Sequence, residues 1–135
     1  LTPEEFEIMK THTTIGADML RELGSHHAGN ALMEYAYQIA RWHHERWDGK
    51  GYPDGLKGDE IPIAAQVVSV ADVYDALTSV RVYKDAIPHE EAIKMILDGK
   101  CGTFNPLLLD CLLEVQDQIA ETLARPADVV AFPTI

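Results

Sequence analysis

Apolar residues recur at helical spacing through most of this 135-residue chain, and the pattern predicts an all-α fold of about five helices. The first helix opens at Thr2, which can cap it, with Pro3 in the first turn and Glu5 completing a capping box. Gly24 is a plausible end for this helix. A second helix is predicted from Ala31 to about residue 44, and three more follow in the regions 61–80, 88–97 and 107–123.

The same spacing predicts which faces of these helices lie inward. His12 shares a helical face with Ile8, Ile15 and Met19, so its ring is expected to point toward the interior. The second helix is expected to face inward through an apolar stripe of Leu32, Tyr35, Ala36, Ile39 and Ala40. The region 61–80 is apolar nearly all round, which is typical of a central, buried helix.

The helical pattern predicts one domain over residues 1–124, followed by a tail of residues 125–135 after Arg125-Pro126. We find no repeat, no low-complexity tract and no second domain. Because the chain begins at Leu1 rather than Met, we expect that it is N-terminally truncated.

The net charge limits the kinds of molecule that the chain is expected to bind. The chain carries 11 basic and 22 acidic residues, a net charge of -11, which argues against general binding of DNA, RNA or anionic membranes. A small anionic ligand stays compatible with this charge if a few Lys or Arg residues are placed locally. Cys101 and Cys111 have no CxxC spacing, so a reducing, cytoplasmic setting is the default, although a disulfide between them remains open. No apolar run is long enough to span a bilayer, and no signal segment opens the chain.

Candidate chemistry is concentrated in residues 42–62, where His43 and His44 end a helix and a Gly-rich loop with Tyr52 follows. Imidazole is the commonest protein ligand of transition metals, and long loops without secondary structure are often functional. The run therefore indicates a metal or phosphate site, while a helix end followed by ordinary turns is the alternative for each feature alone. His12 alone would more often be a core residue than a ligand.

Charged residues after the loop add to this picture. Asp72 lies in mid-helix among apolar residues, where a buried carboxylate needs a partner, a metal or a proton. Asp75 shares its face, with a solvated helix face as the equal alternative. Arg81 and Lys84 can hold phosphate oxygens near a helix end, and a solvated surface is their ordinary alternative.

Taken together, four segments in this order resemble the HD-GYP domain: KTHT around His12, HHERWDGKGYPDGLKGDEIP from His43, ADVYDAL from Ala71, and RVYK from Arg81. The resemblance covers roughly residues 1–113. It implies an all-helical HD-superfamily bundle of bacterial origin that hydrolyses cyclic di-GMP with two or three metal ions, often iron or manganese.

The resemblance also implies roles for individual residues. It assigns metal binding to His12, His43, His44 and Asp72. It assigns substrate binding to Tyr52, Asp75, Arg81 and Lys84, and docking on GGDEF-type cyclase domains to Gly51, Tyr52 and Pro53.

The chain departs from the family in one respect, because it contains no His-Asp dipeptide. In HD-GYP domains this dyad lies upstream of the KxHT segment, and its aspartate bridges the metals. We therefore expect one weakly held metal at His12, His43 and His44, an active parent protein, and a chain that is inactive alone. Apolar surface left uncovered would favour a homodimer or the exchange of elements between copies. The alternatives are an incomplete domain that binds cyclic di-GMP or docks on a cyclase, and a structural module that uses the His pair only for packing.

Overall fold

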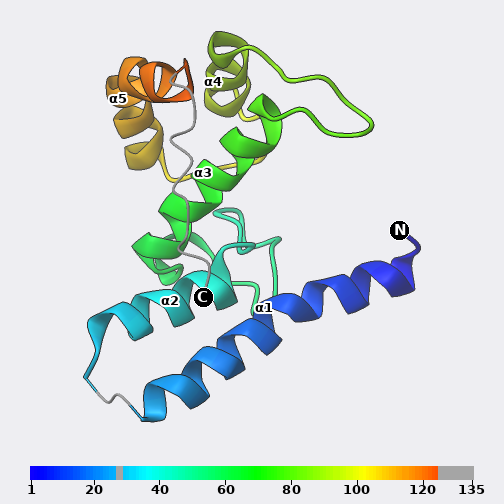
Figure 1. Cartoon of the computed structure of the whole chain (residues 1–135), viewed down its shortest axis with the longest axis vertical. Helices are drawn as coiled ribbons and strands as arrows, with labels where there is room; N and C mark the ends of the chain where they lie inside the picture. The colour runs from blue at the N-terminus through cyan, green and yellow to red at the C-terminus, as the bar shows by residue number, and fades with distance from the viewer. Residues whose placement is uncertain (27–28, 125–135) are drawn as a thin grey trace, which may run out of the picture.

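The computed structural model describes residues 1–26 and 29–124, which form five α-helices joined by loops (Figure 1). The helices are α1 (Pro3–Ser25), α2 (Ala31–Trp42), α3 (Ile63–Thr78), α4 (His89–Leu97) and α5 (Pro106–Ala124), with a short 3₁₀ turn, η1 (Gly58–Glu60), before α3. The described residues contain no β-strand. The prediction of an all-α fold of about five helices is confirmed, whereas the predicted tail of residues 125–135 lies outside the described residues.

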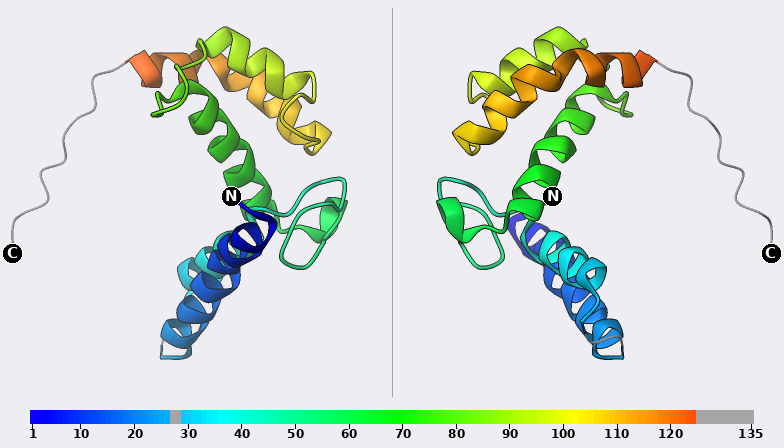
Figure 2. Two further views of the ribbon diagram at one scale, coloured as in Figure 1. Left: turned by 90° about the vertical axis from the view of Figure 1, so that its right-hand side faces the viewer. Right: turned by 90° about the vertical axis from the view of Figure 1, so that its left-hand side faces the viewer.

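The helices form two groups connected by α3. α1 and α2 lie side by side as a hairpin, α3 leads away from α2, and α4 and α5 pack together at its far end (Figures 1 and 2). The long loop between α2 and α3 projects to one side of the junction between the two groups (Figure 2). This loop follows the His pair, so the His pair also lies near the junction of the two helix groups.

The α1–α2 hairpin is held by small residues. Thr13 and Ala17 of α1 are completely buried, and Gly16 lies so close to α2 that an added Cβ would be 3.8 Å from the Cβ of Ala40. The capping box at the start of α1 is also present, with the Glu5 N–H donating to Thr2 Oγ1 at 3.1 Å and the Thr2 N–H donating to Glu5 Oε2 at 2.7 Å. Close approach of the two backbones fixes the end of α2, which carries the His pair, against the middle of α1.

The main hydrophobic core lies between α3, α4 and α5. Val70, Ile93, Ile96 and Leu112 are buried there, and Phe104 and Leu108 pack against them with other partly buried residues. This core anchors one end of α3, while the other end contacts α2.

Several predictions of inward faces are wrong. On α1 the exposed fractions are 70% for Ile8, 57% for Ile15 and 61% for Met19, and His12 lies on this exposed face. On α2, Leu32 and Tyr35 are also exposed. The reason is that α1 and α2 meet through the small-residue stripe, which leaves the larger apolar side chains uncovered by other described residues.

The prediction that the helix after Pro62 is buried is also wrong in part. α3 is central because it contacts both α2 and α4, yet only Ala65, Gln66 and Val70 are buried, and Asp72 is exposed. The three buried residues lie in the first half of α3, and its second half is only partly covered. The two cysteines are free thiols. Within the described ranges, no helix is both long enough and apolar enough to cross a membrane.

Candidate metal centre

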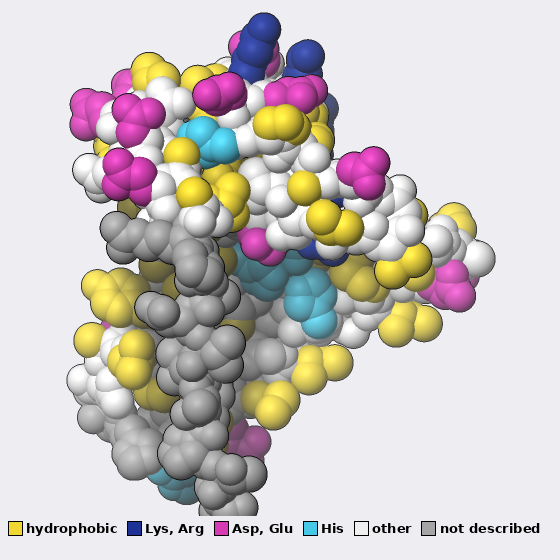
Figure 3. All heavy atoms as spheres, turned by 45° about the horizontal axis from the view of Figure 1, so that its top comes forward, with side chains coloured by type: hydrophobic (Ala, Val, Ile, Leu, Met, Phe, Trp, Pro, Cys, Tyr) yellow, Lys and Arg dark blue, Asp and Glu magenta, His cyan; other side chains and the backbone are white. Residues whose placement is uncertain are grey.

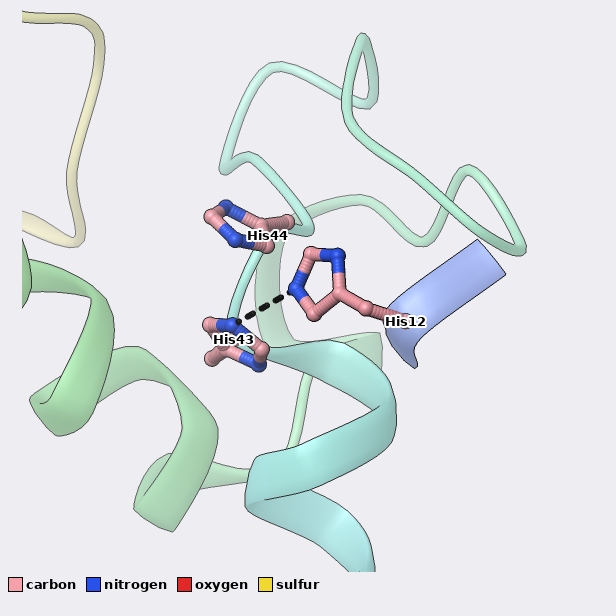
Figure 4. Close-up of side chains that lie close together, drawn as sticks. All are labelled: His12, His43 and His44. Carbon is pink, nitrogen blue, oxygen red and sulfur yellow. Dashed lines mark hydrogen bonds between the residues drawn. The ribbon is translucent and has the colours of Figure 1, made fainter. Parts of the chain in front are cut away.

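Three histidines from two separate segments converge at the junction of α1, α2 and the long loop. His12 comes from the middle of α1, His43 caps the end of α2, and His44 begins the loop (Figure 4). One ring nitrogen from each lies within 4.8 Å of the others. Figure 3 shows histidine side chains at the surface midway along the molecule, next to acidic, basic and hydrophobic side chains.

The hydrogen bonds of two of these rings define where their lone pairs point. His12 Nδ1 is 2.7 Å from the Met9 carbonyl oxygen, and His43 Nδ1 is 2.8 Å from the Ile39 carbonyl oxygen. A carbonyl oxygen can only accept, so each Nδ1 must carry the hydrogen. In the neutral rings the two Nε2 atoms are therefore both acceptors.

These two Nε2 atoms face each other at 3.5 Å (Figure 4). Two acceptors do not stabilise each other, and a positive charge between them would. Two nitrogens bound to one ion at about 2.1 Å are separated by roughly 3 to 3.5 Å in octahedral or tetrahedral geometry. The residues therefore fit a transition-metal ion, with backbone carbonyls orienting the rings as is usual around metals.

The third ring is held in its neutral, ligand-competent form. Burial lowers the pKa of His44 to about 4, helped by the neighbouring His43 and His12 and opposed by Asp72. The Tyr52 ring stacks on His44 with a centroid distance of 5.0 Å and an interplanar angle of 23°. His44 is thus neutral at pH 7 and fixed on one side by an aromatic face.

A cavity of about 430 Å³ opens beside the His pair, between the long loop, α3 and the start of α5. His43, His44, Tyr52 and Asp72 all line it. Its far wall includes Asn105, Gln66, Ser69 and Thr103, and the Asn105 amide donates to Gln66 Oε1 at 3.0 Å. The cavity has room for a small polar ligand next to the three imidazoles.

Asp72 shares this cavity but is not in the group of converging metal-ligating atoms. Its charge still reaches the site, because it opposes the lowering of the His44 pKa and helps burial raise the pKa of Tyr52. The prediction that Asp72 is a ligand stays a prediction.

The long loop is organised by Glu45, which the sequence interpretation did not single out. This residue is only 4% exposed, and its carboxylate accepts three backbone N–H bonds, from Asp54 at 2.6 Å, Gly55 at 3.1 Å and Leu56 at 2.9 Å. Burial raises the pKa of Glu45, and the three N–H donors oppose that rise. The Glu45 carboxylate, next to His44 in the chain, thus holds the backbone of residues 54–56 on the far side of the loop.

A second carboxylate ties the same loop to α2. Asp54 accepts from Arg41 Nε at 2.9 Å, from Arg41 Nη2 at 3.1 Å and from Trp42 Nε1 at 2.7 Å. These bonds hold the pKa of Asp54 below its ordinary value, the Arg41 bond being the main cause. The loop is therefore fastened both to its own first turn and to the helix that carries the His pair.

Gly51 explains why the loop needs glycine at its centre. A Cβ added here would lie 2.5 Å from the Arg46 nitrogen and 2.6 Å from the Glu45 Cα, and closer still to the His44 carbonyl oxygen. The next residue, Tyr52, donates its N–H to that same His44 carbonyl at 3.2 Å. Only glycine lets the chain pass this near, and the passage brings the Tyr52 ring onto His44.

The remaining predicted site residues lie elsewhere. Arg81 and Lys84 pair through their backbones in the turn between α3 and α4, and neither lines the cavity. The Lys84 ammonium donates to the Leu77 carbonyl at 3.0 Å, which caps the end of α3. Asp75 is exposed and accepts from Ser79 Oγ at 3.2 Å. Their predicted roles in substrate binding stay predictions.

Basic residues that the sequence interpretation passed over line the cavity instead. They are Lys10, Arg46 and Lys50. Lys10 precedes His12 by two positions, and the other two belong to the loop, so proximity to the His motifs was the available signal.

Comparison with known proteins places these features in a family. A sequence profile described as an HD domain matches residues 1–106. The chain is 45% identical over 130 residues to a cyclic di-GMP phosphodiesterase of Thermotoga maritima, covering 95% of this chain and 33% of that protein. It is 41% identical over 128 residues to a cyclic di-GMP phosphodiesterase of Vibrio cholerae, covering 95% of this chain and 26% of that protein.

A third relative has a different printed substrate. It is a 3'3'-cGAMP-specific phosphodiesterase of Vibrio cholerae, 39% identical over 128 residues, with 95% of this chain and 24% of that protein covered. The chain thus spans between about a quarter and a third of the length of these relatives.

Proposed function

The chain belongs to the HD domain family, as its HD-GYP motifs predicted, and on that basis we propose that it is part of a metal-dependent phosphodiesterase. The proposed substrate is cyclic di-GMP, a bacterial second messenger, and the proposed location is the cytoplasm. The observation that carries the proposal is the pair of His12 and His43 Nε2 atoms facing each other at 3.5 Å, with His44 beside them and a cavity alongside.

Each group of residues at the site has a separate proposed role. His12, His43 and His44 would hold the ion, and the Met9 and Ile39 carbonyls keep two of the rings aimed at it. A bound metal ion supplies a nucleophilic water at neutral pH and neutralises charge on phosphoryl oxygens. Imidazole donors suit iron as well as zinc, copper and nickel, and we propose iron or manganese. We propose that Asp72, which lines the cavity, orients a polar group of the ligand or adds a ligand to the ion.

The proposal is tested by hydrolysis. The 135-residue chain and the longer protein that contains it would be supplied with Fe²⁺ or Mn²⁺ and given cyclic di-GMP, and linear product would be followed by chromatography. We expect turnover by the longer protein and its loss in His43→Ala. Equal turnover with and without metal would contradict the proposal.

A second candidate is a domain that binds the dinucleotide or docks on a GGDEF cyclase without cutting. It is favoured by one observation: among the described residues, the converging group holds three imidazoles and no carboxylate. Docking would use Gly51, Tyr52 and Pro53 of the loop, all three of which are partly exposed. Binding of cyclic di-GMP by the longer protein without any turnover would select this candidate.

We also propose that the chain self-associates through the exposed apolar face of α1. Ile8, Ile15 and Met19 are each more than half exposed there. Light scattering that gives the mass of a monomer at high concentration would contradict this.

A further inference from the structure

The cavity beside the His pair carries positive charge in a strongly acidic chain. The whole chain has 11 basic against 22 acidic residues, yet Lys10, Arg46 and Lys50 all line this one cavity. The carboxylates in its lining are Glu45 and Asp72, and that of Glu45 is occupied by three backbone N–H groups. A cationic pocket within an acidic surface concentrates small anions at that spot.

Lys10 is held over the aromatic side of the cavity. Its ammonium lies 5.2 Å from the Phe6 ring centroid and 5.6 Å from that of Tyr52. The Tyr52 ring in turn stacks on His44. Lys10 therefore sits beside the imidazole group, separated from it by one aromatic ring.

The Lys10 charge is available to a ligand. Among the described residues, the Lys10 ammonium forms an ion pair with Glu7 at 2.7 Å. The Glu7 side chain is 69% exposed and the Lys10 side chain 26% exposed. Exposed ion pairs contribute little, so an incoming anion can compete with Glu7 for the ammonium.

The loop side of the cavity contributes a second available ammonium. Asp48 binds Arg46 Nη2 at 2.7 Å and accepts the Lys50 backbone N–H at 3.0 Å, which fixes the start of the turn. The Asp48 side chain is 23% exposed, against 69% for Glu7, so Arg46 is held more firmly by its carboxylate than Lys10 is. The described residues provide no hydrogen-bond or ion-pair partner for the Lys50 side chain, so its ammonium is free to meet a ligand.

We propose that Lys10 and Lys50 form a phosphate-binding site that is separate from the three histidines and works without metal. It rests on the proposed function in one respect, since it takes the phosphate of a cyclic dinucleotide that is not being cut, and the other phosphate is held at the His group only once the metal is bound. Lys10 approaches from α1 and Lys50 from the loop, so the two ammonium groups grip the ligand across the mouth of the cavity.

The test is binding of cyclic di-GMP to the 135-residue chain stripped of metal with EDTA, measured by calorimetry at low ionic strength. Wild type is expected to bind, and Lys10→Ala and Lys50→Ala are each expected to weaken binding about five- to tenfold. Lys50→Arg should restore affinity, because the guanidinium keeps the charge. The control variant Lys94→Ala removes the same charge from an exposed position of α4 that does not line the cavity. It is expected to bind cyclic di-GMP like wild type.

Two comparisons keep the inference separable from the proposed function. Lys50→Ala is expected to bind metal like wild type, so its loss of metal-free affinity would not be a loss of the metal site. Guanosine, which lacks phosphate, is expected to bind Lys10→Ala and Lys50→Ala as it binds wild type. Lys50 is exposed and its side chain makes no hydrogen bond or ion pair with the described residues, so Lys50→Ala stays informative even if Lys10→Ala does not fold. Metal-free binding that is absent in wild type, or that is unchanged in Lys50→Ala relative to Lys94→Ala, would overturn the inference.

Discussion

Replacing Glu45 by Gln should destabilise the protein through the long loop. The substitution keeps the shape and volume of the side chain, so it isolates the role of the carboxylate. Glu45 Oε1 accepts from the Asp54 and Gly55 N–H groups, and Oε2 accepts from the Leu56 N–H. An amide can keep the first two bonds, but its NH₂ group then faces the Leu56 N–H, so one bond is lost and two donors oppose each other.

Two terms set the size of this effect. A hydrogen bond to a charged group contributes about 1.5–3 kcal/mol to stability, and the neutral amide also weakens the two bonds it keeps. Against this, the carboxylate is 4% exposed and its burial raises the pKa of Glu45, so removing the charge recovers part of a desolvation cost. We expect Glu45→Gln to lower the free energy of unfolding by about 1–2 kcal/mol. Glu45→Ala, which removes both acceptor oxygens and with them all three bonds, should lower it by about 3 kcal/mol.

Urea unfolding at pH 7 measures both values from the shift of the transition midpoint. Glu60→Gln is the matched control, since Glu60 is exposed on the same loop and accepts one long bond, from the Lys57 N–H at 3.3 Å. Its effect should stay within about 0.5 kcal/mol. If Glu45→Gln were as stable as Glu60→Gln, the carboxylate would not organise the loop, and the reasoning would be refuted.

Three further predictions concern the site and the core. Gly51→Ala should cost about 1–3 kcal/mol in urea unfolding and weaken metal binding in calorimetry, because the added Cβ meets the backbone of Glu45 and Arg46; a wild-type result on both counts would contradict the close approach. The metal-free protein should lose about 1–2 kcal/mol of stability as pH falls from 6.5 to 4, because the pKa of partly buried His44 is lowered and the unfolded state therefore takes up the proton first. In urea unfolding at each pH, His44→Gln should flatten this dependence of stability on pH, and an unchanged slope would argue against the reasoning. Ile96→Ala should cost about 2–5 kcal/mol because Ile96 is completely buried, whereas Val82→Ala, at a fully exposed position, should change the midpoint little.

The helices and the grouping of the three histidines could be predicted from sequence because both leave local signals. The capping box at Thr2 and Glu5 fixed the start of α1, and the spacing of His12 from the adjacent His43 and His44 matched a family pattern. Such signals depend on neighbours in the chain, so they persist whatever the tertiary packing.

The buried faces could not be predicted in the same way. Helical spacing shows that α1 has apolar stripes but not which stripe is covered, and the contact between α1 and α2 uses Thr13, Gly16 and Ala17 rather than the larger Ile15. Small residues permit the closest approach of two helices, which outweighs the larger apolar area of the other stripe. α3 was expected to be buried because it is apolar all round, yet it bridges two groups and leaves Val67 half exposed.

Other lining residues, Glu45 and the three basic ones, were missed because their position depends on how the loop folds back. Glu45 stands between the His pair and a Gly-rich segment whose N–H groups need acceptors, and that need was the one signal in the sequence for its role. No spacing rule connects Lys10 with Lys50. Both line one cavity because the loop folds back and passes close to its own first turn at Gly51.

The central claim, that His12, His43 and His44 bind one metal ion, is tested most directly by following the histidine ring signals in NMR during titration with Zn²⁺, which is diamagnetic. We predict that the signals of these three residues shift together and saturate at one ion per chain, while those of His26 and His89, which lie outside the group, stay in place. Shifts that reach only one of the three rings, or that spread equally to His26 and His89, would contradict the claim.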